Sequence, residues 1–124
     1  MPTSSSVDPD RAASHYWHLR DGELRKLVIA TTDAVGVLQR AQAVVAQQWP
    51  TARVGEESWE TAVTTARAAV RAARTKRTQL RRMVNTLKDT LRIRKNLEAA
   101  CPDKMREAIE VAERMCDYMD AHGF

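Results

Sequence analysis

Hydrophobic positions recur in steps of three and four along three long stretches of this chain. In residues 56–98 the apolar row is Val63, Ala66, Val70, Ala73, Leu80, Val84, Leu87 and Leu91. This spacing places the row on one face of a helix. The row breaks at residues 75–78, where Arg77 holds an apolar position. We therefore expect the helix to bend there or Arg77 to extend along its aliphatic stem.

The stretches 14–49 and 103–121 follow the same rhythm. The first, with Ser14 as its expected N-cap, has the seam Leu24, Val28, Thr31, Val35, Leu38, Gln42, Val45 and Trp49. The other has the seam Met105, Ile109, Ala112, Cys116 and Met119. Pro50 and Gly55 predict a turn after the first helix, Pro102 suits the start of the last one, and Gly123 is a suitable C-terminal cap.

Three amphipathic helices joined by short turns predict an all-α protein. We expect an antiparallel, up-down-up three-helix bundle with spectrin-like, coiled-coil packing, formed by residues 14–124 as one domain. Residues 1–13, rich in Ser, Pro and Asp, are expected to form a flexible N-terminal tail. A bend or fraying is expected at Asp21 and Gly22. The last helix is the shortest, so one end of the long pair should project beyond it.

The net charge of +4 is concentrated in the middle helix. Between residues 61 and 95 there are eleven Lys or Arg and one acid, Asp89. A basic stripe flanks the apolar row: Arg67, Arg71, Arg74, Arg81, Lys88, Arg92 and Lys95. The stripe is either a solvated face, partly neutralised by Glu107, Glu110, Glu113 and Asp117 of the acidic last helix, or a surface for an acidic partner.

No motif in the sequence indicates catalysis, so we expect no enzyme activity and no cofactor. A glycine-rich phosphate loop, a paired-histidine metal helix and a nucleophile elbow are all missing. His15 and His18 are three residues apart but have no evident third ligand, so no metal site is predicted. Cys101 is expected to be exposed in a turn and Cys116 to be a core residue. No apolar run approaches the roughly 20 residues that span a bilayer, and the few cysteines without a signal peptide predict an intracellular location.

Residues 21–28, Asp-Gly-Glu-Leu-Arg-Lys-Leu-Val, resemble the opening helix of the tubulin-binding cofactor A (tubulin-specific chaperone A) family. The run 81–83, then Leu87, Leu91 and residues 97–99, is similar to the second half of that family's middle helix. The resemblance covers roughly residues 21–120. Unlike many family members, this chain has no proline in the centre of the helix, at residues 75–78.

This resemblance implies a cytoplasmic, cytoskeleton-associated chaperone rather than an enzyme. The family holds monomeric β-tubulin for assembly of the α/β-tubulin heterodimer, without using nucleotide. We expect a monomer or weak homodimer that does not bind membranes. The partner-binding residues, taken from the basic stripe and the matched motif, are Arg25, Lys26, Arg67, Arg71, Arg74, Arg81, Lys88 and Arg92.

Two other functions remain open. A basic helical nucleic-acid-binding protein is one, although Trp17, Trp49 and Trp59 all lie outside the basic run, which disfavours stacking on bases. The other is a structural coiled-coil subunit of a larger assembly. The break at Arg77 and the short turns weigh against a long coiled coil.

Overall fold

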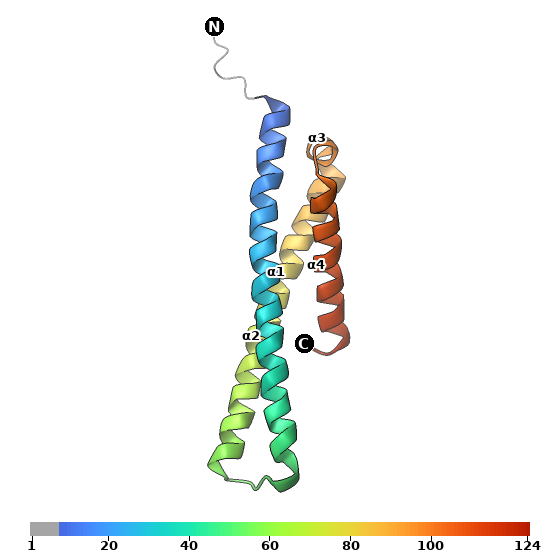
Figure 1. Cartoon of the computed structure of the whole chain (residues 1–124). Helices are drawn as coiled ribbons and strands as arrows, with labels where there is room; N and C mark the ends of the chain where they lie inside the picture. The colour runs from blue at the N-terminus through green and yellow to red at the C-terminus, as the bar shows by residue number, and fades with distance from the viewer. Residues whose placement is uncertain (1–7) are drawn as a thin grey trace.

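The structure is a computed structural model that describes residues 8–124 (Figure 1). Within that range every regular element is helical: α1 (Pro9–Gln48), the 3₁₀ turn η2 (Trp49–Thr51), α2 (Glu57–Ile93), α3 (Lys95–Ala99) and α4 (Asp103–Ala121). The prediction of an all-α protein is therefore confirmed. The part described holds four α-helices rather than the expected three.

Helix α1 begins five residues before the expected start at Ser14. A side-chain oxygen of Asp8 accepts a hydrogen bond from the backbone N–H of Asp10 at 3.0 Å, and Pro9 occupies the first helical turn. Both features favour a helix start. The added turns are held by packing, because Ala13 and Trp17 are buried. The expected tail was thus too long, and its residues 1–7 lie outside the described range.

Helix α1 also runs without interruption through Gly22, where a bend or fraying was expected.

The helix expected at 56–98 is wrong at its C-terminal end. Helix α2 ends at Ile93, Arg94 adopts φ −99° and ψ 86°, and the single-turn α3 follows. This change of direction turns Leu97 into the core, where its side chain is 8% exposed. In contrast, α2 is continuous through residues 75–78, and Arg77 reaches across to α4.

Helices α1 and α2 form a long antiparallel hairpin, and α4 lies beside its open end (Figure 1). Gly55, with φ +86°, lies in the turn that reverses the chain between them, as expected. The closed end of the hairpin, defined here as residues 42–66, extends beyond the end of α4 (Figure 1). The expected projection of the long pair is therefore observed, and it leaves part of the hairpin with only two helices.

The core consists of two clusters. The larger one joins α1, α2, α3 and α4 around buried residues that include Trp17, Leu24, Leu87 and Met105. The smaller one lies where α4 ends, and Met119 packs there in the cluster of Leu38 and Ala73. All five seam residues predicted for the last helix are buried.

The predicted seams of α1 and α2 are buried only where α4 is present. At the closed end, Trp49 is 70% exposed and Gln42 is also exposed, while Ala62 is buried instead. The seam prediction assumed a third helix along the whole pair. Where there are only two helices, the small residues on their mutual contact line are buried and the seam meets solvent.

Candidate partner-binding surface

Four of the basic residues of α2 are spaced seven residues apart. Arg67, Arg74, Arg81 and Lys88, called the basic row below, follow one another at this interval. Seven residues are close to two helical turns, so the four side chains lie along one edge of α2. The row runs along the open end of the hairpin beside α4 and continues toward the closed end.

Acidic residues of α4 neutralise one half of the basic row. Arg81 forms ion pairs with Asp117 at 2.8 Å and Asp120 at 3.0 Å, and Lys88 pairs with Glu113. The hydrogen bond that Arg81 donates to the Asp117 carboxylate raises the pKa of the Arg81 guanidinium, which keeps it charged. These two predicted partner-binding residues are therefore engaged within the chain.

Arg77 strengthens the same contact between α2 and α4. It pairs with Asp120 at 3.1 Å and donates a hydrogen bond to the backbone carbonyl oxygen of Phe124. Arg77 can therefore occupy a position of the apolar seam because Asp120 of α4 lies beside its guanidinium. The solvated-face interpretation is supported here, because Glu113 and Asp117 act as expected.

Two acids that were expected to neutralise the stripe, Glu107 and Glu110, form no ion pair with α2 in the described part of the chain. Glu110 instead lies 3.8 Å from Arg114 on its own helix. Glu107 forms no ion pair within 4 Å with any of residues 8–124.

Among residues 8–124, the other half of the basic row has no acidic ion-pair partner. Arg74 donates a long hydrogen bond of 3.4 Å to the carbonyl oxygen of Gly123. Arg67 and Arg71 are exposed, and neither makes an ion pair with any residue in the described part of the chain. Arg92, near the opposite end of α2, pairs with Asp89 on its own helix at 3.2 Å.

The matched motif lies on α1, whereas the basic row lies on α2. Arg25 pairs with Asp21 one turn earlier, and Lys26 is exposed. The other six predicted residues belong to α2, where Arg67, Arg71 and Arg74 are neighbouring cations toward the closed end of the hairpin.

Sequence reasoning missed an apolar hollow beside these cations. Gln42, Val45, Ala46, Trp49 and Ala66 line a space of about 350 Å³ between α1 and α2. At its edge the rings of Trp49 and Trp59 lie 5.8 Å apart. The signal was present in the sequence, because the apolar seam of the first two helices extends farther than the third helix can cover.

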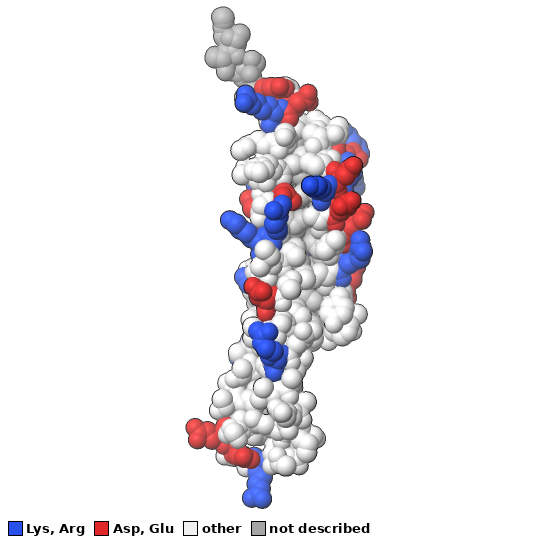
Figure 2. Space-filling view, in the orientation of Figure 1, with Lys and Arg blue, Asp and Glu red and all other residues white. Residues whose placement is uncertain are grey.

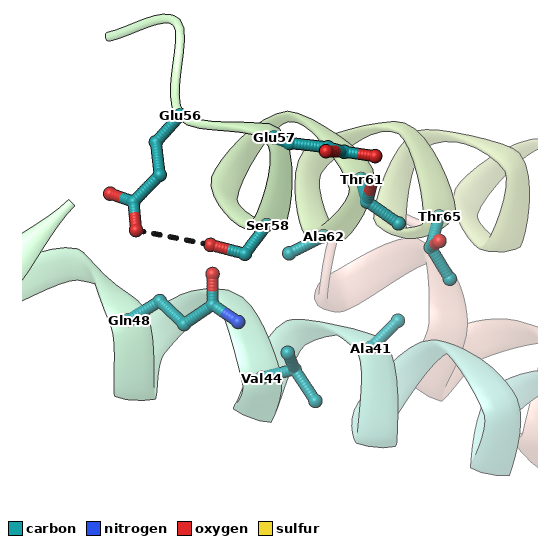
Figure 3. Close-up of a pocket in the computed structure, with 9 residues that line it drawn as sticks. All are labelled: Ala41, Val44, Gln48, Glu56, Glu57, Ser58, Thr61, Ala62 and Thr65. Carbon is teal, nitrogen blue, oxygen red and sulfur yellow. Dashed lines mark hydrogen bonds between the residues drawn. The ribbon is translucent and has the colours of Figure 1, made fainter. Parts of the chain in front are cut away.

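A larger hollow of about 700 Å³ also lies at the closed end (Figure 3). Its walls mix small and polar residues: Ala41, Val44, Gln48, Glu56, Glu57, Ser58, Thr61, Ala62 and Thr65. Ser58 and Glu56 are joined by a 3.2 Å hydrogen bond across its rim (Figure 3). Two acids, Glu56 and Glu57, line this hollow, so it is a weaker candidate for an acidic partner.

Figure 2 shows how charge divides the face on which α4 is seen. Acidic and basic side chains gather along the part of the molecule that includes α4, whereas the closed end is mostly uncharged except near its tip (Figure 2). Exposed large apolar side chains of this end include Val44, Trp49 and Val54. On the face shown, the closed end therefore presents mainly uncharged residues.

The cysteines do not form a reactive site. Cys101 is only 8% exposed, so the expectation that it is exposed was wrong, while Cys116 is a core residue as predicted. Burial raises the pKa of both thiols. Both are free cysteines and favour the unreactive thiol over the thiolate.

The histidines of the paired motif, His15 and His18, are both exposed. Among residues 8–124 no three His, Cys, Asp or Glu side chains gather where they could hold a metal ion. None of the helices in the same range has an apolar stretch long enough to cross a membrane.

Comparison of the chain with family models, curated proteins and solved structures gives no match.

Proposed function

We propose that this chain is a non-catalytic binding protein that holds an acidic protein client. The observation that carries the proposal is the pair Arg67 and Arg71, exposed cations without an ion-pair partner in residues 8–124. Arg67 also lines a hollow of about 320 Å³ together with the half-buried Trp59. The resemblance of residues 21–28 names monomeric β-tubulin as the client. On this proposal α1, α2 and α4 act as an up-down-up three-helix bundle.

The chemistry of the surface supports a protein rather than a nucleic acid as partner. Cations steer an acidic client during encounter, and a few central apolar or aromatic residues supply most of the affinity. Binding of nucleic acid would favour a long uninterrupted cationic surface. Here Arg77, Arg81 and Lys88 already pair with α4. Arg67, which makes no ion pair in residues 8–124, follows directly in the sequence on Ala66, a lining residue of the apolar hollow.

The experiment is a pull-down from cytosol with the purified protein as bait, at about 0.15 M salt, where surface charges are screened beyond about 8 Å. The double variant Arg67→Glu/Arg71→Glu is compared with the native protein. A matched control, Arg11→Glu/Arg82→Glu, makes the same change of charge at two other exposed positions. Circular dichroism should show equal helix content in all three proteins.

Recovery of β-tubulin without equal α-tubulin, lost in the first variant and kept in the control, supports the proposal. The same recovery must resist nuclease treatment. Nuclease-sensitive recovery of many proteins without tubulin enrichment would favour the nucleic-acid alternative. A defined set of other proteins would favour the structural-subunit alternative and would remove β-tubulin as the client.

A further inference from the structure

Residues of α2 that are seven apart lie on nearly the same face, so they allow the groove occupied by α4 to be traced along the hairpin. Three rows on this face run toward the closed end: Leu80–Ala73–Ala66–Trp59, Val84–Arg77–Val70–Val63 and Lys88–Arg81–Arg74–Arg67. The first members of these rows lie in the core beside α4 or pair with it. The last members of all three rows lie on the same face, beyond the end of α4.

Helix α1 repeats this arrangement. Its two rows are Leu24–Thr31–Leu38–Val45 and Val28–Val35–Gln42–Trp49. Leu24, Thr31 and Leu38 are buried, whereas Trp49 is 70% exposed. The groove between α1 and α2 thus continues past α4 with an apolar floor and no helix above it in the described part of the chain.

The point at which α4 stops is well defined. Met119 and Phe124 pack in the cluster that contains Leu38, Ala73 and Val70. The next residues of the rows toward the closed end, Val45 and Ala66, line the hollow of about 350 Å³. The hollow is therefore the continuation of the α4 groove rather than a separate surface.

We infer that this continuation binds an amphipathic helix of a partner protein with acidic residues along one edge. The inference rests on the proposed function and specifies the part of the client that is held. Arg67 and Arg74 would meet these acids as Arg81 and Lys88 meet Asp117 and Glu113 of α4. From Ala73 to Trp59 is 14 residues of α2, or about 21 Å at 1.5 Å per residue. A partner helix of about four turns covers that length.

A second copy of this chain is a poorer occupant. The acidic, amphipathic helix that the groove selects is α4, and in each copy α4 is already packed on its own hairpin. Its acids Asp117, Asp120 and Glu113 are paired with α2 of the same chain. The acidic helix must therefore come from another protein.

The test uses a synthetic peptide with the sequence of residues 103–121 as the probe, because this sequence packs in the open-end part of the same groove. The full chain carries the photo-reactive amino acid p-benzoyl-phenylalanine in place of Val63, which lies in the uncovered groove. A control protein carries it in place of Ala68, which is exposed on a different face of α2. Peptide binding is followed by fluorescence anisotropy, and cross-linked residues are identified by mass spectrometry under reducing conditions.

We expect cross-links from position 63 and none from position 68. Arg67→Glu should weaken peptide binding at least tenfold, and Arg82→Glu should not change it. A peptide in which Glu110, Glu113, Asp117 and Asp120 are replaced by Lys should fail to bind. Absence of binding, or equal cross-linking at the two positions, would overturn the inference, as would dimerisation of the chain through position 63 in light scattering.

These outcomes separate the two proposals. Peptide cross-linking at position 63 without recovery of β-tubulin would support the groove as a helix-binding site and would reject β-tubulin as the client. Recovery of β-tubulin that depends on Arg67 and Arg71, without peptide binding, supports the client and removes the groove.

Discussion

The indole nitrogen of Trp17 donates a hydrogen bond of 2.6 Å to the backbone carbonyl oxygen of Leu97, eighty residues later in the chain. Trp17 is 1% exposed and belongs to the larger core cluster with Leu97 and Cys101. The bond fastens the first turns of α1 to the break between α2 and α4. It joins the two regions in which the structure departs from the sequence prediction, the N-terminal part of α1 and the separate α3.

Trp17→Phe should destabilise the protein by about 1–3 kcal/mol, because the carbonyl of Leu97 loses its buried indole donor, with a further cost for the space left by the smaller ring. Trp59→Phe, at a half-buried position, should cost less than about 1 kcal/mol. Unfolding in urea, followed by circular dichroism, measures both. Equal losses would show that the buried hydrogen bond is not important for stability.

Arg81→Glu should destabilise the protein more than Arg82→Glu. The first change places a carboxylate beside Asp117 and Asp120, whereas Arg82 is exposed and makes no ion pair in residues 8–124. Since partly exposed ion pairs contribute about 0–1 kcal/mol, we expect Arg81→Ala to cost no more than about 1 kcal/mol. Thermal unfolding at low and high salt measures these effects. The Arg81→Glu penalty should shrink with salt; a penalty that salt does not alter would contradict an electrostatic cause.

The two alanines Ala69 and Ala66 should differ in how strongly their enlargement affects stability. Ala69 is 5% exposed between the paired helices, so Ala69→Leu should cost about 1–3 kcal/mol through overpacking. Ala66 lines the uncovered hollow, so Ala66→Leu should change stability by less than about 0.5 kcal/mol. Denaturant unfolding of the two variants provides the comparison. A larger loss for Ala66→Leu would mean that the hollow is not open.

Stability should fall at alkaline pH partly because of Cys101 and Cys116. Burial raises the pKa of both thiols above the ordinary value of 9.0, so the folded state favours the protonated form. Their contribution is complete below pH 9 and is lost as the pH rises through the higher folded pKa. The unfolding free energy of the native chain should therefore drop more between pH 8 and pH 10.5 than that of Cys101→Ala/Cys116→Ala. Equal drops would show that other groups cause the whole effect.

The same burial predicts slow chemical modification. Iodoacetamide at pH 7.5 should label neither thiol appreciably in the folded protein and both rapidly in urea. Mass spectrometry of the intact chain counts the labelled thiols. Fast labelling of Cys101 under native conditions would show that the turn before α4 opens readily.

Local sequence determined the helices and most of their limits. The three-and-four spacing alone predicts α4, with Met105, Ile109 and Cys116 on its buried face, because a short helix packed on two others buries one continuous stripe. The turn at Gly55 was equally predictable, since a positive φ there favours glycine. The basic stripe and the acidic last helix were also evident from the sequence.

Only the tertiary structure decided which part of the apolar seam and of the basic row is covered by α4. Trp49 and Leu38 occupy equivalent seam positions in the sequence, yet Leu38 is fully buried and Trp49 is 70% exposed, because α4 reaches one and not the other. Likewise Arg81 and Arg67 belong to one row, but the first pairs with α4 and the second has no ion pair among the described residues. The spacing of apolar and charged residues along the sequence indicates on which face of a helix each residue lies. Whether another helix covers that face depends on where the chain places its third helix.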